Sequence, residues 1–299
     1  IPLRLVGSEM CIRDSTPAVA LPTINFLTRE HEIKLVTQPD RPAGRGKGLK
    51  PTEVAINFPE AAKPKNENEL AELLIGADLL ITIGYGRILK DSTLQIPKFG
   101  GINLHFSLLP KWRGAAPVQR TIEAGEKITG VTVFQMDSGM DTGPIWDQIE
   151  YQIPYGMSSP ELFDALAHLG ANSVQRTLKK IAEGAKPIAQ SGTPTIANKI
   201  SKNECRIDWQ IDADSIIRKI KAFSFNPGVF SFIRGEQIKI LDARLGNSEL
   251  SPGELNTSGE VGCLHGSVQL LTVTPAGRRV MSVSDWLNGF KPELGERFE

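Results

Sequence analysis

The chain has 299 residues, of which 40% are hydrophobic, and its 34 basic and 34 acidic residues leave no formal net charge. This length favours two domains, and the neutral balance argues against a nucleic-acid-binding field over the whole protein while leaving room for a local basic patch. The three cysteines are far apart without a CxxC pair, so we expect reduced thiols, a cytoplasmic location and neither disulfides nor a structural metal. Because every apolar run is far shorter than the roughly 20 residues of a membrane-spanning helix, we expect no membrane segment.

The first fifteen residues do not fit a simple strand-to-helix pattern. Arg13 and Asp14 stand where a buried strand should be apolar. Either residues 3–6 form the first strand and an insertion follows it, or residues 1–15 are not native sequence. We favour the second alternative because assembly junctions gather at termini, and we expect the next helix to begin near Thr16.

Short apolar runs then alternate with polar connections as far as residue 143. Strands are predicted at residues 33–36, 79–84, 102–105 and 131–136, and helices at 68–75 and 116–124. This alternation is typical of an α/β domain with a mostly parallel sheet and helices on its faces.

A longer helix is predicted to begin at Ser159, which can cap it, and to end at Gly184. The following stretch is rich in Pro, Gly, Ser and Thr and lacks periodicity, which is typical of a linker. Short apolar runs around residues 207, 230–233, 238–241 and 268–273 then predict a small, mostly β domain of the barrel type. We therefore expect a first domain at residues 1–184, a linker at 185–200 and a second domain at 201–299.

Asn103 and His105 lie two residues apart in an apolar strand, so both project from the same face. They end that strand at the carboxyl edge, where open α/β sheets bind ligands. The alternative is a core histidine whose hydrogen bonds are satisfied internally. The strand at 131–136 also ends in a polar turn, which we expect to bring Asp137 and Asp141 to the same edge.

Two other kinds of site were weighed for these residues. A calcium loop starting at Asp137 fails on spacing, because it needs glycine where Thr142 stands and glutamate where Gln148 stands. A serine hydrolase is disfavoured because no G-x-S-x-G elbow surrounds Ser107. An amide, an imidazole and a carboxylate without a nucleophile instead suit direct acyl transfer to an amine, with Asn103 donating to the oxyanion and Asp141 orienting His105 and favouring its cationic form.

The sequence resembles the formyltetrahydrofolate-dependent formyltransferase superfamily. The resemblance is carried by the runs NLHFSLLPKWRGAAPVQ, from Asn103 to Gln119, and DSGMDTG, from Asp137 to Gly143. A narrower resemblance, to methionyl-tRNA formyltransferases, is carried by WRGAAPVQ, by TPAVALP from Thr16, by QPDRPAGRGKGLKP from Gln38 and by ANKISK in the C-terminal half.

This resemblance implies a Rossmann-like catalytic domain followed by an OB-like barrel that binds tRNA, with 10-formyltetrahydrofolate as the co-substrate, charged initiator tRNA as the acceptor, no metal, and a monomer. It implies that Asn103, His105 and Asp141 are the catalytic residues. It places the folate contacts on a loop and its neighbour, namely Ser107, Leu108, Leu109, Pro110, Tyr85 and Gly86. Phe106 departs from the family pattern, which has a small residue or proline there, and we expect it to reshape the pocket wall.

A glycine-containing loop carries four positive residues and no acidic one: Arg41, Arg45, Lys47 and Lys50. Such a run is in general a solvated surface loop, but a cationic loop can also order against phosphates. The resemblance implies that this loop contacts the acceptor stem. Two alternatives stay open: a formyltransferase acting on a small-molecule amine, such as a sugar nucleotide or glycinamide ribotide, and an RNA-binding homologue without catalysis.

Overall fold

The computed structural model describes residues 3–7, 19–43, 48–85, 88–224 and 227–299. The chain forms two compact units. The N-terminal unit contains residues 1–118, 127–153 and 160–199, and the C-terminal unit contains residues 119–126, 154–159 and 200–299. Among the helices of the described ranges, none has the length and apolar character that a bilayer crossing needs.

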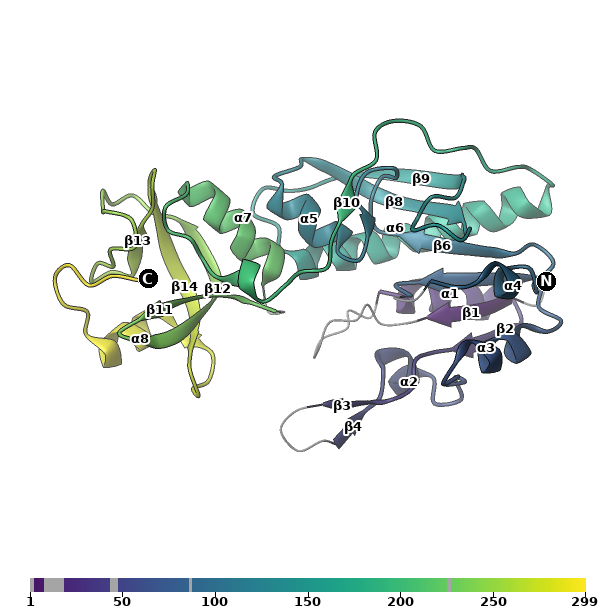
Figure 1. Cartoon of the computed structure of the whole chain (residues 1–299), viewed down its shortest axis with the longest axis horizontal. Helices are drawn as coiled ribbons and strands as arrows, with labels where there is room; N and C mark the ends of the chain where they lie inside the picture. Colours follow the sequence, from purple (N-terminus) through teal and green to yellow (C-terminus); the bar gives the residue numbers. More distant parts are fainter. Residues whose placement is uncertain (1–2, 8–18, 44–47, 86–87, 225–226) are drawn as a thin grey trace. The chain divides into compact units, whose positions relative to one another are not determined.

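The N-terminal unit is built on a six-stranded sheet with the order β2-β1-β5-β6-β8-β9 (Figure 1). Its strands are β1 (Leu3–Gly7), β2 (Ile33–Val36), β5 (Leu79–Ile83), β6 (Gly101–His105), β8 (Ile128–Gln135) and β9 (Ile145–Gln152). The first four run parallel, whereas β8 is antiparallel to β6 and β9 is antiparallel to β8. The predicted α/β domain with a mostly parallel sheet is confirmed, and the sheet has an antiparallel edge.

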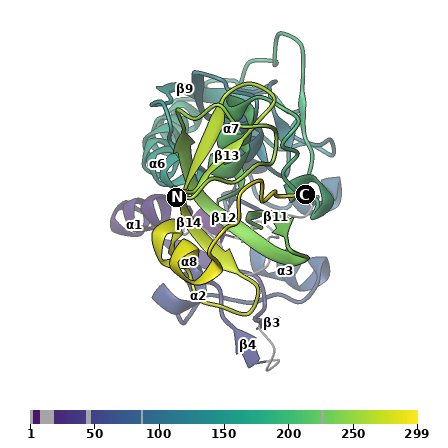
Figure 2. The ribbon, with the colours of Figure 1, turned by 90° about the vertical axis from the view of Figure 1, so that its left-hand side faces the viewer.

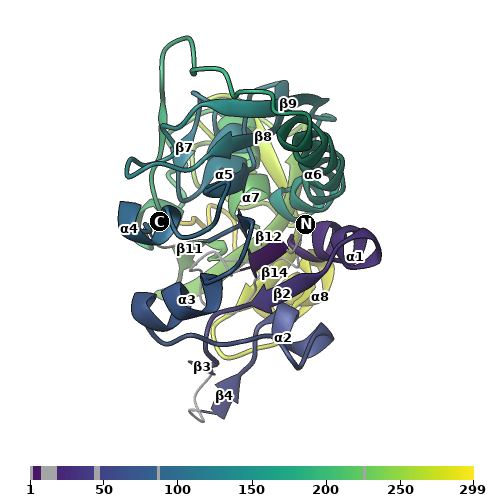
Figure 3. The same ribbon diagram turned by 90° about the vertical axis from the view of Figure 1, so that its right-hand side faces the viewer.

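Helices cover both faces of this sheet (Figure 3). They are α1 (Leu21–Glu30), α2 (Glu53–Asn57), α3 (Glu67–Leu74), α4 (Asp91–Leu94) and α6 (Ser159–Ala182). A further helix, α5 (Pro117–Glu123), belongs to the C-terminal unit from residue 119 onward. On one face α6 approaches β6 closely, because a Cβ at Gly170 would lie 2.5 Å from the Leu104 side chain. On the other face Leu74 of α3 and Leu94 of α4 share a buried cluster with Leu80 of β5. All of β5 is therefore buried, as expected of a strand between two helical layers.

Most predicted elements of this unit lie within a few residues of their expected bounds, and α3 and α5 correspond to the predicted helices 68–75 and 116–124. The long helix ends at Ala182, two residues before the expected glycine. Strand β9 was not predicted, because as an edge strand it keeps several exposed polar residues and lacks a continuous apolar run.

The structure has a strand at residues 3–7, where one of the two alternatives from the sequence expected a strand at residues 3–6. Strand β1 pairs with both β2 and β5, with Leu3 aligned to Ile33 on one side and to Leu79 on the other. Helix α1 begins at Leu21 and has a proline in its first turn, so the expected start near Thr16 is wrong. Residues 8–18, which include the polar run that disagreed with a strand, lie outside the described residues.

The C-terminal unit contains a curled antiparallel sheet with the order β11-β12-β14-β13, and β15 pairs with β14. Its elements are the 3-10 turn Asn203–Cys205, α7 (Ala213–Phe223), β11 (Val229–Ile233), β12 (Glu236–Leu245), β13 (Glu260–Gly262), β14 (Ser267–Pro275), β15 (Met281–Ser282) and α8 (Val283–Phe290). Helix α7 packs against β12 and β14, and α8 against β14 and β15 (Figure 2). Trp209 and Trp286 are buried core aromatics. The sheet forms a half-barrel, in agreement with the predicted OB-like domain.

Candidate active site

Strand β6 places Asn103 and His105 on the face opposite to α6. The hydroxyl of Thr82, which is aligned with Asn103 on the neighbouring strand β5, donates to Asn103 Oδ1 over 2.7 Å. Because this bond occupies the amide oxygen, the Asn103 NH₂ group is directed away from Thr82 and can donate elsewhere. Asn103 is only half-buried, so its amide remains accessible at the end of the sheet.

His105 is 5% exposed and is held between two loops. Its Nε2 donates to the Trp112 carbonyl oxygen over 2.8 Å, and its Nδ1 lies 3.6 Å from Asp141 Oδ2. A carbonyl oxygen only accepts hydrogen bonds, so Nε2 carries a hydrogen. Both ring nitrogens therefore face oxygen atoms, Nε2 that of a carbonyl and Nδ1 that of a carboxylate.

Asp141 reaches His105 by a different route from the one expected. We predicted that β8 would end at the carboxyl edge of the sheet, but β8 is antiparallel and Gln135 near its end lies opposite Ile102 near the start of β6. The loop between β8 and β9 returns toward His105, and the Asp141 carboxylate accepts the Gly114 N–H over 2.8 Å. Asp137 lies in the same loop, where its carboxylate accepts hydrogen bonds from the Gly139 N–H and the Thr142 hydroxyl.

Two residues at this site have a backbone conformation that is uncommon outside glycine. The φ angle is +61° at Trp112 and +55° at Asp141. Each costs on the order of 1 kcal/mol or more and is kept only where surrounding contacts hold it. At Trp112 these contacts include the bond from His105 and the N–H donated to Thr195 Oγ1 over 2.8 Å.

The loop after β6 carries four of the predicted folate contacts. The Ser107 hydroxyl is fully buried and donates to the Lys111 carbonyl oxygen over 2.6 Å, so it has a structural partner. Leu109 is buried, and its backbone N–H and carbonyl are bound by Thr132 and Gln148. Leu108 and Pro110 are half-buried. The loop is thus fixed next to His105 by hydrogen bonds to its backbone carbonyls, to the Leu109 N–H and from the Ser107 hydroxyl.

The two weaker folate candidates lie after β5. Tyr85 is half-buried and packs against the apolar cluster that joins α3, α4 and the sheet. Gly86 lies outside the described residues. Phe106 does not line this side of the sheet, contrary to expectation. Its ring packs edge to face on Phe163 of α6, because the side chain after His105 in an extended chain points to the opposite face.

The sequence did not indicate two contributions to this site. Thr82 is the single polar residue in the apolar run of β5, and that exception was a usable signal. The second is the stretch that we expected to be a linker: β10 (Ile196–Ala197) pairs in parallel with β7 (Arg113–Gly114), directly beside Trp112. These contacts join residues about eighty positions apart, so local composition gave no indication of them.

Two of the four predicted tRNA-binding residues, Arg41 and Lys50, lie in a hairpin that projects from the N-terminal unit and is formed by β3 (Arg41–Ala43) and β4 (Gly48–Lys50) (Figure 1). Arg41 is aligned with Lys50, whose side chain is exposed. Arg45 and Lys47 lie outside the described residues. The base of the hairpin is anchored by a 2.8 Å hydrogen bond between the hydroxyls of Thr37 and Thr52.

Neither described thiol is available as a nucleophile. Burial raises the pKa of Cys205 to about 11 and that of Cys263 to about 12, so both are protonated at neutral pH. Within the described ranges, no three His, Cys, Asp or Glu side chains cluster in a way that could hold a metal ion.

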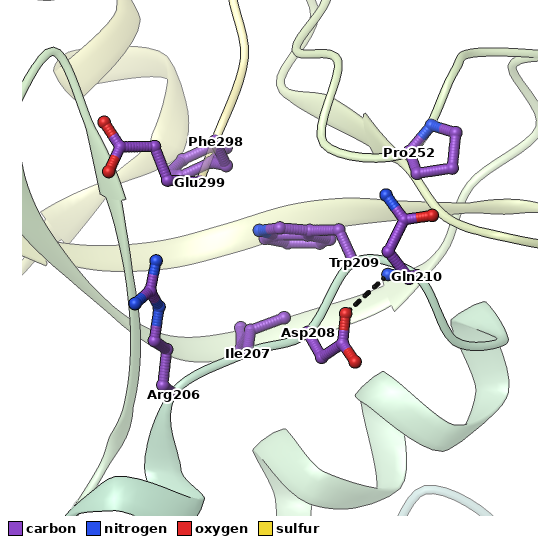
Figure 4. Close-up of a pocket in the computed structure, with 8 residues that line it drawn as sticks. All are labelled: Arg206, Ile207, Asp208, Trp209, Gln210, Pro252, Phe298 and Glu299. Carbon is purple, nitrogen blue, oxygen red and sulfur yellow. Dashed lines mark hydrogen bonds between the residues drawn. The ribbon is translucent and has the colours of Figure 1, made fainter.

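The C-terminal unit has a pocket of about 460 Å³ (Figure 4). Its floor is apolar and includes the buried Trp209 and Phe298, while its rim carries charges of both signs. The lining residues are Arg206, Ile207, Asp208, Trp209, Gln210, Pro252, Phe298 and Glu299. None of the predicted catalytic, folate or tRNA residues is among them.

Comparison with known proteins agrees with this fold. Residues 21–178 match the family model described as Formyl transferase, and residues 199–291 match the one described as Formyl transferase, C-terminal domain. HypX from Aquifex aeolicus, in complex with tetrahydrofolic acid, is 18% identical with a TM-score of 0.71, and the likeness covers 98% of this chain but 48% of HypX. This chain therefore spans about half the length of HypX.

Two further solved structures are similar along nearly their whole length. The N-formyltransferase from Helicobacter canadensis, in complex with folinic acid and dTDP-3-aminofucose, is 19% identical with a TM-score of 0.65, covering 93% of this chain and 99% of that one. The methionyl-tRNA formyltransferase from Clostridium thermocellum is 15% identical with a TM-score of 0.58, covering 83% and 96%. At these identities the likeness shows a shared fold.

Proposed function

We propose, because the chain belongs to the formyl transferase family, that it moves the formyl group of 10-formyltetrahydrofolate to the amino group of methionyl initiator tRNA. Formyl-tetrahydrofolate is the donor in this family, and similar structures hold tetrahydrofolic acid or folinic acid. The observation that carries the proposal is the group formed by Asn103, His105 and Asp141: an accessible amide beside an imidazole that is paired with a carboxylate.

The donor supplies the formyl carbon, and attack by the amine forms a C–N bond and places negative charge on the formyl oxygen. When this intermediate collapses, the bond between the formyl carbon and the folate nitrogen breaks, the proton lost by the attacking amine is balanced by one taken up at that nitrogen, and tetrahydrofolate leaves. The residues present fit this chemistry, because the Asn103 NH₂ group, oriented by Thr82, can donate to that oxygen. One such donor is commonly worth about 3 to 4 kcal/mol in the transition state.

His105 stabilises the same charge in this proposal. Its ring is positioned by the Trp112 carbonyl oxygen, and its Nδ1 lies 3.6 Å from the Asp141 carboxylate. For the Nε2 hydrogen to reach a substrate, its bond to Trp112 must open, so the loop at residues 110–114 takes part in catalysis. Asp141 contributes to catalysis by positioning the His105 ring and by accepting the Gly114 N–H, which fixes the loop that carries Trp112.

The basic hairpin supports tRNA as the acceptor. Arg41 is aligned with Lys50 in the backbone register of the hairpin, and the Lys50 side chain is exposed. Exposed cationic residues bind the phosphates of nucleic acids, such as those of an acceptor stem. No acidic residue occurs between Arg41 and Thr52 to neutralise the hairpin locally.

A small-molecule amine is the second candidate acceptor. It is favoured by the N-formyltransferase in complex with dTDP-3-aminofucose, whose likeness extends over 93% of this chain, against 83% for the methionyl-tRNA formyltransferase. In that case the sheet and the three catalytic residues would act in the same way, and the hairpin would be a solvated surface loop.

The two acceptors can be separated with the purified protein and 10-formyltetrahydrofolate. We expect formylation of methionine-charged initiator tRNA and none of dTDP-linked aminosugars, measured by release of tetrahydrofolate and by acid-stable label on the acceptor. The opposite pattern would contradict the tRNA proposal and support the small-molecule acceptor. Uncharged tRNA is the control for turnover that does not depend on the amine.

The hairpin can be tested with Arg45→Ala. We expect a higher KM for tRNA. The slope of log kcat/KM against log salt concentration should become shallower by about 1, because the variant lacks one cation that contacts a phosphate. The KM for the folate donor should not change. Gln175→Ala, on the exposed face of α6, is the control, and unchanged tRNA kinetics in Arg45→Ala would contradict a role for this residue.

A further inference from the structure

Gln190 connects the two loops that hold His105, although it lies in the Pro- and Gly-containing stretch after α6. Its Nε2 donates to the carbonyl oxygens of Asp141 and Gly143, both over 2.8 Å. Its Oε1 accepts from Arg113, over 2.6 Å from Nη2 and 3.2 Å from Nε. Both amide hydrogens and both lone pairs of this side chain are therefore used.

The surroundings of Gln190 show that this contact is specific to one residue. Its neighbours Ile188 and Ala189 are exposed, whereas Gln190 is half-buried. On the other side of the loop, Gly143 is pressed against β8, because a Cβ there would lie 1.7 Å from the Gln135 carbonyl oxygen. The turn that carries Asp141 is thus held between β8 and the Gln190 amide.

The turn needs such support, because Asp141 has a φ of +55°. A residue other than glycine keeps this conformation only where its surroundings fix it. That conformation sends the carboxylate toward the Gly114 N–H and His105 Nδ1, while the Asp141 carbonyl points to Gln190. Arg113, at the other end of the Gln190 amide, precedes Gly114 directly, so one side chain ties both sides of the Asp141 contact together.

We propose that Gln190 is a positioning residue for formyl transfer: its amide fixes the Asp141 turn to the Arg113 loop and so holds the Asp141 carboxylate against His105 and Gly114. This inference rests on the proposed function, because it takes His105 and Asp141 as catalytic.

Two variants of Gln190 distinguish the hydrogen bonds that its amide donates from those that it accepts. Gln190→Met keeps the length and removes all four hydrogen bonds, whereas Gln190→Glu keeps acceptors for Arg113 but places carboxylate oxygens against two carbonyl oxygens. We expect kcat to fall about tenfold or more in both, with the KM for the folate donor nearly unchanged, since loss of alignment affects the transition state. Full activity in Gln190→Glu would overturn the proposal, because the donated bonds would then be dispensable.

A double-mutant cycle identifies the route of the effect. In an Asp141→Asn background we expect Gln190→Met to cause little further loss of kcat, because the contact that it supports is already impaired. Additive losses would show that Gln190 acts elsewhere and would overturn the proposal. Gln175→Met, on the exposed face of α6, is the matched control, and melting curves identify a variant that does not fold.

A readout that does not depend on turnover separates this inference from the proposed function. The Gly114 N–H is bonded to the Asp141 carboxylate, so its hydrogen exchange reports whether that carboxylate is in place. We expect faster exchange at Gly114 in Gln190→Met and Gln190→Glu and no change in Gln175→Met. Unchanged exchange in the Gln190 variants would overturn the positioning role. Full turnover in Asp141→Asn and His105→Ala would instead refute the proposed catalytic group.

Discussion

Replacing Asp141 by Asn tests the electrostatic part of the proposed mechanism. Asn keeps the shape of the side chain and an oxygen that can accept the Gly114 N–H, but it removes the charge that lies 3.6 Å from His105 Nδ1. The substitution therefore changes the charge beside the His105 ring and leaves the packing of the side chain as it was.

The magnitude follows from the distance and the burial of the pair. At 3.6 Å, two unit charges interact by about 4 to 5 kcal/mol at an effective dielectric constant of about 20. The side chains are 6% and 20% exposed, so salt screens this interaction only in part. If about half of it is specific to the transition state, the loss is about 2 kcal/mol, which corresponds to an about 30-fold lower kcat.

The assay is the steady-state rate of formyl transfer at saturating donor, with acceptor concentration varied to separate kcat from KM. A melting curve checks the fold. A kcat within about twofold of the wild type, in a variant that melts normally, would refute the role of the Asp141 charge. Asp137→Asn, in the same loop but bonded only to its own loop among the described contacts, is the control and should leave kcat unchanged.

Three further predictions concern single side chains. His105→Ala should lower kcat by about two to four orders of magnitude, because it removes a group that donates to the reacting atoms; retained turnover would exclude His105 from catalysis. Thr82→Val removes the hydroxyl that orients the Asn103 amide, and we expect kcat to fall by about tenfold with an unchanged melting temperature, as measured by the same assay. In the C-terminal unit, burial raises the pKa of Glu204, but hydrogen bonds from the Ser201 N–H and from Arg120 outweigh it, so the pKa lies below the usual 4.5. The free energy of unfolding should fall as the pH drops from 4.5 through this lowered value, and Glu204→Gln should flatten that part of a denaturation series.

Where a strand is buried on both faces, the periodicity of the sequence was sufficient to predict which side chains share a face. The alternation in β6 placed Asn103 and His105 on one side and Leu104 on the other, and the structure has this arrangement. The direction of β8 was not predictable in the same way. A helix between two strands is typical of a parallel crossover, and α5 occupies that place, yet β8 returns antiparallel at the edge of the sheet.

This reversal matters for how Asp141 reaches His105. If β8 were parallel, Asp141 would follow directly at the carboxyl edge, and a short turn would suffice. Because β8 is antiparallel, the chain must travel back along the sheet, and it does so with a loop whose backbone conformation at Asp141 is strained. Hydrogen bonds to the Asp137 carboxylate hold this loop from within. The carbonyl oxygens of Asp141 and Gly143 are held from outside, by Gln190 in the stretch after α6.

The same dependence applies to Trp112, whose carbonyl holds His105. Its φ of +61° is equally uncommon, and its N–H is bound by Thr195 from the same stretch. The composition of this stretch predicted a linker. Its hydrogen-bond partners are remote in sequence, so composition could not indicate them. A shared support predicts a shared failure: shortening the stretch between Gln190 and Thr195 should displace both loops that contact His105, even though no catalytic side chain is altered. Activity should then fall more than in either Gln190→Met or Thr195→Val alone. If the two loops were supported independently, the shortened chain would lose only as much activity as one of these two single variants.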